Sequence, residues 1–181
     1  MTHSLRVSRR GLLKLGAFGV ASFAARDVAH AATERERALS FVHTHTGESA
    51  RIVYWAGGDY LPDGLAAVDH VLRDHYSGDV HEIDASLLDV LHRLAQRLET
   101  AQPFHVISGY RSPATNAALA ARSGGVAQHS LHMAGQAIDV RLPGCELHSL
   151  RDTALALRAG GVGYYGGPDF VHIDVGRVRR W

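Results

Sequence analysis

The sequence contains a single cysteine, Cys145, among its 181 residues. One cysteine excludes an intramolecular disulfide and a structural zinc site built from several thiolates. A thiol nucleophile needs an activating base and an exposed thiolate. We therefore expect Cys145 to be a small buried or loop residue rather than a nucleophile.

The sequence also lacks a large excess of charge of either sign, because its formal net charge is +1. Residues 1–31 contain five basic residues and one acid, so the remainder is slightly acidic and has no basic stripe. This excludes the electrostatic footprint of a nucleic-acid-binding protein. With 46% hydrophobic residues, the length is typical of one globular domain with a substantial core.

No hydrophobic run crosses a bilayer comfortably, since the apolar run at residues 12–25 is short and contains Lys14. A basic start, this run and the small residues Ala29 and Ala31 follow the order of a secretory signal. Residues 8–14, SRRGLLK, resemble a twin-arginine export signal. We predict a signal peptide over residues 1–31, the twin-arginine machinery as a partner, and a periplasmic domain over residues 32–181 without a stable membrane span. A basic amphipathic helix is the alternative for the leader.

The remaining chain mixes predicted strands and helices. Apolar alternation and turn signals predict strands at residues 39–43, 51–55, 103–109, 136–142 and 170–175. Helical spacing predicts helices at 63–76, 84–100 and 147–158, and Ser112-Pro113 predicts the start of another. The elements do not alternate regularly as βαβ units, which favours an α+β fold. We interpret residues 160–163, Gly-Gly-Val-Gly, as turns, because a phosphate loop would need a lysine and a strand–loop–helix context.

The sequence is rich in histidine, with 13 residues, and histidine is the commonest metal ligand. His132, Asp139 and His172 offer two imidazoles and a carboxylate, which with an open fourth position form the ligand set of a catalytic zinc. Gly135 lets the backbone turn between His132 and the following strand. Strand alternation places Asp139 and His172 on polar faces opposite apolar ones. The pattern predicts a metal site presented by two strands and a loop.

A zinc hydrolase also needs a base and a group that stabilises developing charge. Asp169, three residues before His172, is the candidate base. Arg111 follows a predicted strand, and its guanidinium suits a substrate carboxylate or an oxyanion. His129 is a candidate hydrogen-bond donor to the substrate.

Each of these residues has a structural alternative. Arg111 alone would be a salt-bridge or solvated side chain, and Asp169 beside Pro168 would be a turn residue. A single histidine is more often structural than a ligand. His43 and His45 alternate on one predicted strand, but they lack a third partner, and we interpret them as surface residues. The joint occurrence of two histidines and an aspartate is what favours the metal site.

The stretch Ser130-x-His132-x-x-Gly135-x-Ala137-x-Asp139, with a histidine downstream, resembles the signature of the zinc D,D-peptidase superfamily. That superfamily includes carboxypeptidases, dipeptidases and endopeptidases of bacterial cell walls. Four further stretches resemble its YcbK-like, murein endopeptidase K type branch: THTGE at 44–48, ISGYRS at 107–112, GGVGYY at 160–165 and FVHIDVG at 170–176. The resemblance covers nearly all of residues 38–181.

The resemblance implies a small antiparallel sheet flanked by helices and one zinc ion held by His132, Asp139 and His172. It implies Asp169 as the base and Arg111 facing the substrate. The implied activity is hydrolysis of peptide cross-links in peptidoglycan, with those joining two diaminopimelate residues as one candidate bond. A D-Ala carboxypeptidase of the same family and a non-catalytic wall-binding module are the alternatives. The intact ligand set argues against the module, because a binder needs no open zinc site.

Overall fold

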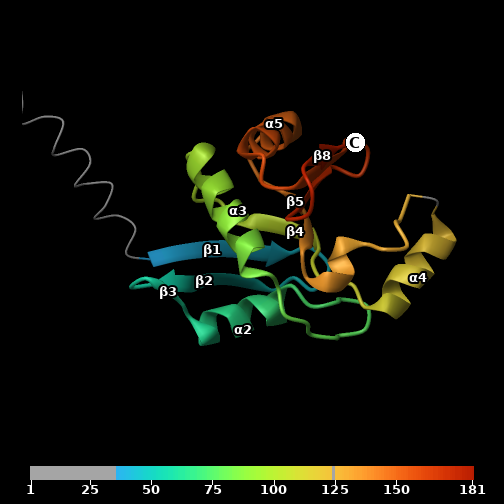
Figure 1. Cartoon of the computed structure of the whole chain (residues 1–181), viewed down its shortest axis with the longest axis horizontal. Coiled ribbons are helices and arrows are strands. Elements are labelled where there is room, and N and C mark those ends of the chain that lie inside the picture. Colours follow the sequence, from blue (N-terminus) through green and yellow to red (C-terminus); the bar gives the residue numbers. More distant parts are fainter. Residues whose placement is uncertain (1–35, 124) are drawn as a thin grey trace, which may run out of the picture. The chain divides into compact units, whose positions relative to one another are not determined.

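The computed structural model describes residues 36–123 and 125–181 (Figure 1). The predicted signal peptide lies outside the described residues. Within them, eight strands form one sheet and four α-helices accompany it, which confirms the predicted α+β class. The strands are β1 (Glu36–His43), β2 (Ser49–Ala56), β3 (Asp59–Tyr60), β4 (Phe104–Ser108), β5 (Ala137–Arg141), β6 (Gly161–Tyr165), β7 (Phe170–Asp174) and β8 (Arg179–Arg180). The helices are α2 (Pro62–Val71), α3 (Ala85–Arg97), α4 (Pro113–Arg122) and α5 (Leu147–Leu157), with a short 3-10 helix η1 (Leu131–Ala134).

The strand order in the sheet is β3-β2-β1-β4-β5-β7-β6-β8. Five neighbouring pairs are antiparallel, but β1–β4 and β6–β8 are parallel. The sheet is therefore mixed rather than purely antiparallel. The parallel β1–β4 pair needs a long crossover connection, and the segment that contains α2 and α3 supplies it.

The core lies between the sheet and the helices α2, α3 and α5. Helix α3 begins after Asp84, whose carboxylate accepts a hydrogen bond from Ser86 N at 2.9 Å, as an N-cap does. The helical spacing of its leucines predicts one apolar stripe at Leu87, Leu88, Leu91, Leu94 and Leu98. The first four are buried and Leu98 is partly buried. Burial of each such side chain stabilises the fold by roughly 1.5–3 kcal/mol. The apolar faces of β5 and β7 belong to the same core, so their polar faces point the other way.

The helix predicted over residues 63–76 ends earlier, at Val71. The buried carboxylate of Asp74 explains this difference. It accepts hydrogen bonds from Tyr76 N and Ser112 N, each at 2.9 Å. A side chain that binds its own following backbone competes with helical hydrogen bonds, and here it also joins this turn to the start of α4. Ser112 caps α4 as predicted, by accepting from Thr115 N at 3.2 Å.

The prediction of turns at residues 160–163 is wrong, because β6 begins at Gly161 and pairs with β7. The glycines leave room for neighbouring side chains. A Cβ on Gly161 would lie 2.5 Å from Asp174 Oδ2, and a Cβ on Gly163 would lie 2.6 Å from the Trp181 ring. Glycine usually indicates a turn, but in this strand it provides space for two large groups.

Among the described residues, no helix combines the length and the apolar character that crossing a membrane requires.

Candidate metal centre

The three predicted ligands come from η1, β5 and β7. His132 lies in η1, where we predicted a loop, and Ser130 precedes it as the N-cap. The 3-10 helix ends at Ala134, and its C-cap residue, Gly135, has φ 65°. A Cβ on Gly135 would lie 2.1 Å from the Glu82 carbonyl oxygen, so both the backbone conformation and the packing require glycine here. The turn that presents His132 therefore depends on Gly135, as the sequence predicts.

Asp139 and His172 are direct partners in the antiparallel register of β5 and β7. Their apolar neighbours Ile138 and Ile173 pair on the opposite face and are buried in the core. His132, Asp139 and His172 are all buried. The alternation of the two strands thus brings the carboxylate and the imidazole together, and η1 adds the second imidazole.

The ligand atoms form a small triangle. His132 Nε2 lies 3.2 Å from His172 Nδ1 and 3.2 Å from Asp139 Oδ1, and His172 Nδ1 lies 2.8 Å from Asp139 Oδ1. A tetrahedral zinc site with bonds of roughly 2.0 Å has ligand atoms about 3.3 Å apart. The observed triangle is close to one face of such a tetrahedron. The fourth corner is left for a water or a substrate atom.

The other nitrogen of each ring fixes where its proton lies. His132 Nδ1 is 2.7 Å from the Gly109 carbonyl oxygen, and His172 Nε2 is 3.1 Å from Asp174 Oδ2. Both partners are acceptors, so these ring nitrogens carry the hydrogens in the neutral rings. The lone pairs of His132 Nε2 and His172 Nδ1 then face each other and the Asp139 carboxylate. Such an arrangement repels itself unless a cation lies between the three atoms, so the residues fit a zinc ion.

Burial and neighbouring charges act on these groups in opposite directions. Burial lowers the pKa of His132, because the charged ring would lose its hydration. Burial alone would raise the pKa of Asp139, but the charges and hydrogen bonds of His132 and His172 outweigh it and hold that pKa well below its ordinary value. These two shifts favour a neutral His132 and an ionised Asp139, the states that bind metal. Burial alone would lower the pKa of His172, but its hydrogen bonds and charge interactions with Asp139 and Asp174 outweigh burial and raise that pKa, so metal binding there displaces a proton.

Arg111 contacts the metal-ligand cluster directly. One terminal nitrogen of its guanidinium donates to Asp139 Oδ2, and its Nε donates to Ser108 Oγ at 2.8 Å. Ser108 is itself the cross-strand partner of Asp139. The predicted charge-stabilising residue is therefore beside the metal centre, held by two hydrogen bonds.

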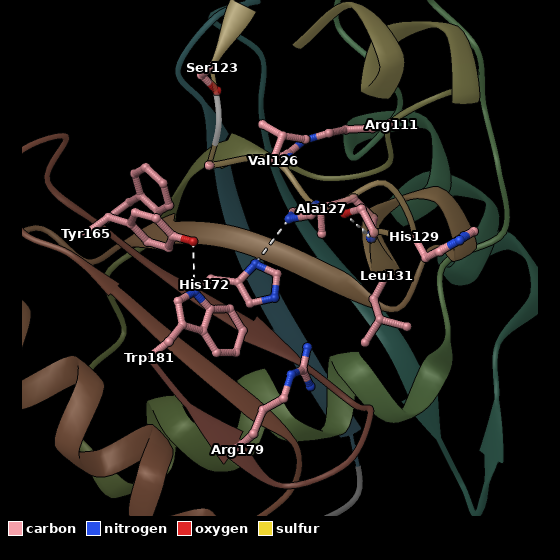
Figure 2. Close-up of a pocket in the computed structure, with 14 residues that line it drawn as sticks. Arg111, Ser123, Val126, Ala127, His129, Leu131, Tyr165, His172, Arg179 and Trp181 are labelled. Carbon is pink, nitrogen blue, oxygen red and sulfur yellow. Dashed lines mark hydrogen bonds between the residues drawn. The ribbon is translucent and has the colours of Figure 1, made fainter. Parts of the chain in front are cut away.

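A pocket of about 440 Å³ opens onto the metal centre. It is lined by His132, His172, Arg111 and the exposed His129, together with a loop around Val126 and an aromatic side formed by Tyr165, Phe170 and Trp181. In the view of Figure 2, His129 and Trp181 lie on opposite sides of His172. The structure thus brings together five of the six predicted site residues.

The structure does not bring Asp169 to this pocket. Its carboxylate is exposed and pairs with Arg141 at 3.1 Å. It lines a different hollow, together with Cys145 and His148. Its φ of 60° is uncommon for a residue other than glycine. The role of Asp169 as the base stays a prediction.

Comparison with known proteins identifies the family. Residues 31–181 match the family described as peptidoglycan L,D-endopeptidase MepK. The peptidoglycan L,D-endopeptidase MepK of Escherichia coli (strain K12) is 44% identical over 176 residues, which is 96% of this chain and 97% of the relative. The probable peptidoglycan L,D-endopeptidase MepK of Haemophilus influenzae is 35% identical over 177 residues, which is 96% of this chain and 95% of the relative. The chain belongs to this family.

Membership of the MepK family agrees with the resemblance drawn from the motifs.

Two residues that the sequence reasoning missed lie next to the metal centre. Asp174 binds the ring of His172, and Arg179 in turn donates to both carboxylate oxygens of Asp174, at 3.0 and 2.7 Å. A carboxylate behind a metal-bound histidine orients the ring and raises its basicity. The signal for Asp174 was available, because it follows His172 by two residues and shares its face of β7.

Two other predictions about single residues have different outcomes. Cys145 is half-buried in a bend, and burial raises the pKa of its thiol, which agrees with a residue that is not a nucleophile. The prediction that His43 is a surface residue is wrong, because its side chain is fully buried, whereas His45 is exposed. His43 continues the buried face of β1 after Leu39 and Phe41, and this alternation was the overlooked signal.

Proposed function

We propose that this protein is a zinc endopeptidase that hydrolyses peptide cross-links of peptidoglycan. The single observation that carries the proposal is the convergence of two imidazole lone pairs and one carboxylate at the base of an open pocket. The names of the relatives, peptidoglycan L,D-endopeptidase, support a bond between an L and a D centre. Cross-links that join two diaminopimelate residues are the bond we propose.

His132, Asp139 and His172 would hold the zinc ion. When bound, zinc supplies Lewis acidity that polarises a carbonyl and acidifies water. The Gly109 carbonyl and Asp174 keep the two rings in the tautomers that point their lone pairs at this position. These contacts prepare the site before the substrate arrives, which avoids reorganisation during the reaction.

Arg111 would stabilise the negative charge that develops on the substrate. Its guanidinium lines the pocket and remains cationic. Two of its nitrogens are bound to Ser108 and Asp139, so the group is fixed in position. A fixed cation beside the scissile carbonyl suits an oxyanion or a neighbouring substrate carboxylate.

We propose Asp169 as the group that takes a proton from the attacking water and returns it to the leaving amine. This role requires Asp169 to leave Arg141. An exposed ion pair of this kind contributes only about 0–1 kcal/mol, so the cost is small. Asp169→Ala should lower turnover by about 100-fold or more with zinc still bound, whereas Arg141→Ala should keep near wild-type turnover. Wild-type turnover in zinc-loaded Asp169→Ala would remove this residue from the mechanism.

The first experiment is a digest of purified cell-wall sacculi with the protein, with and without a chelator, followed by mass spectrometry of the muropeptides. We expect cross-linked dimers to disappear only without chelator, and to persist with His132→Ala. His45→Ala is the matched control, because it removes an exposed histidine outside the metal centre.

The same digest separates the alternatives. Release of free D-alanine, with cross-links intact, would replace the proposal with a carboxypeptidase. Zinc-loaded protein that binds muropeptides and cleaves none would replace it with a wall-binding module.

We further propose that residues 1–31 are a twin-arginine signal peptide, that residues 32–181 form the zinc peptidase domain, and that the protein acts in the periplasm. The paired arginines Arg9 and Arg10 and the peptidoglycan-directed names of the relatives support this. Replacement of both arginines by lysine should retain the protein in the cytoplasm, as measured by cell fractionation. Unchanged export would show that another route carries it.

A further inference from the structure

One side of the pocket is a continuous aromatic surface. The rings of Tyr165 and Phe170 are stacked with their centroids 4.6 Å apart. The Trp181 indole donates from Nε1 to the Tyr165 hydroxyl at 2.8 Å, and its centroid lies 5.2 Å from that of His172. Figure 2 shows the indole beside the metal-ligand ring. The aromatic surface therefore extends up to the metal centre.

Several contacts hold Trp181 in place. Its backbone pairs with β6, since Trp181 N donates to Val162 O at 3.3 Å and Tyr164 N donates to Trp181 O at 3.1 Å. The Arg179 guanidinium lies 4.8 Å from the indole centroid, in cation–π contact. The absence of a side chain at Gly163 creates the space for the ring, because a Cβ there would lie 2.6 Å from it. These contacts fix one orientation of the ring.

Despite these contacts, Trp181 remains 50% exposed. A large aromatic ring that is fixed in place and half uncovered offers apolar area at little entropic cost to whatever covers it. The ring is within reach of a peptide at the metal centre, because it lines the same pocket and lies 5.2 Å from the His172 ring. The Arg179 cation already contacts the indole, so the uncovered apolar area suits the methylene groups of a substrate side chain.

We propose that Trp181 is the substrate-positioning and specificity-determining residue of this pocket. It takes the alkyl side chain of a diamino-acid residue next to the scissile bond, whose methylene groups lie along the indole. The inference rests on the proposed function and deepens it. Gly163 supports this role, because only a residue without a side chain leaves room for the ring in this position.

The first test is kinetic and uses a soluble cross-linked muropeptide dimer. Trp181→Ala should raise KM by about tenfold with kcat and zinc content nearly unchanged, and Trp181→Phe should restore most of the loss. A fall in kcat together with zinc content, at unchanged KM, would overturn the proposal, because Trp181 would then only support His172.

Gly163→Ala provides the matched variant, because it keeps Trp181 but displaces the ring. It should raise KM in the wild-type background and have no further effect in Trp181→Ala, since the two changes act on the same contact. An equal rise of KM in both backgrounds would overturn the role of Gly163 and of the ring position.

A binding measurement keeps this test separate from catalysis. The protein has two tryptophans, Trp55 and Trp181, and Trp55 lies in β2 beside Arg37, outside the residues that line the pocket. In Trp55→Phe, fluorescence therefore reports Trp181 alone. Titration of the metal-free variant with the dimer should give a saturable change in emission, and an uncross-linked peptide without a diamino acid should give none.

The outcomes of the two measurements are distinct. No emission change in a variant that still cleaves the dimer would overturn the proposal for Trp181 while leaving the endopeptidase intact. Emission change without cleavage by zinc-loaded wild type would support the contact and remove the proposed endopeptidase activity.

Discussion

Two pairs of histidine rings in this protein have nearly the same mutual geometry. The rings of His132 and His172 have centroids 5.0 Å apart and planes at 63°, and those of His43 and His75 have centroids 5.3 Å apart and planes at 60°. His45 stacks on His75 at 4.2 Å, so the second group also contains three potential ligands. By residue type and ring spacing alone, the two clusters would be difficult to tell apart.

The hydrogen bonds of the outer ring nitrogens separate the two clusters. In the metal centre, the outer nitrogens donate to acceptors and leave lone pairs facing inward. In the other cluster, His43 Nδ1 accepts from the backbone N–H groups of His45 and Thr46, at 3.3 and 3.4 Å. The proton of neutral His43 therefore lies on Nε2, which is buried without a hydrogen-bond partner.

Within the part of the chain that the structure describes, the ligand atoms of the second cluster do not converge with those of a third group as the atoms of the metal centre do. We infer that a histidine cluster binds metal when the outer nitrogen of each ring donates a hydrogen bond to an acceptor, which leaves the other nitrogen free to bind the ion. Ring spacing follows from packing and does not decide metal binding.

The largest effect is expected from the metal centre itself. His132→Ala removes one of three ligands, and we expect turnover to fall by about 1,000-fold or more and bound zinc to be lost on desalting. Metal analysis of the purified variant, alongside turnover on cross-linked muropeptides, measures both. Retention of one equivalent of zinc would mean that the triangle described here is not the site.

The next effect tests the acceptor behind a ring. Asp174→Asn keeps the shape of the side chain and removes its charge, so His172 loses its ionised partner. We expect zinc affinity to fall by about 10–100-fold, as measured by competition with a chelating dye. An unchanged affinity would contradict the view that outer hydrogen bonds distinguish the clusters.

A smaller effect is expected for stability in the second cluster. Burial, with the nearby charges of His45 and His43, lowers the pKa of His75 from 6.5 to about 4. Because the folded-state pKa is the lower one, protonation favours the unfolded chain. The stability that neutral His75 contributes is complete above pH of about 6.5 and is lost as the pH falls toward 4.

His75→Gln should therefore flatten the loss of unfolding free energy between pH 7 and 4, by on the order of 1 kcal/mol given the partial exposure of the ring. Denaturant unfolding of both proteins across this range measures the difference. Parallel pH profiles would show that His75 does not contribute.

The smallest effect is expected for His45→Ala, which removes the exposed member of the second cluster. Zinc stoichiometry should remain one per chain and turnover should remain within about twofold of wild type. Metal analysis at saturating zinc measures this. A drop from two equivalents to one would make the second cluster a metal site and would break the comparison.

Sequence reasoning grouped the three candidate ligands, which the structure brings together, because strand alternation is local. Asp139 and His172 each interrupt an apolar pattern, and the periodicity of a strand places both on its polar face. Sequence reasoning missed Trp181, because that residue reaches the pocket through the parallel pairing of β6 and β8. No local sequence pattern predicts this pairing. Asp169 has φ 60° and pairs with Arg141, and neither feature follows from the local sequence pattern.

The prediction of turns at residues 160–163 was wrong for a related physical reason. The local signal of the glycines is that of turns, but what requires them is the volume of Asp174, Arg179 and Trp181, which come from later in the chain. A glycine that is required because a side chain would not fit can be explained only when the residues packed against it are known.

Asp139 and His172 oppose each other across β5 and β7, so the alignment of two strands sets two of the three ligands. A slip of one residue would turn the polar face of one strand toward the core and separate the pair. Misaligned chains therefore have no complete ligand set, and each tenfold excess of metal over its dissociation constant adds about 1.4 kcal/mol to the correct alignment alone. If the triad binds zinc as proposed, the metal would therefore also favour chains in which these two strands are paired in the correct register.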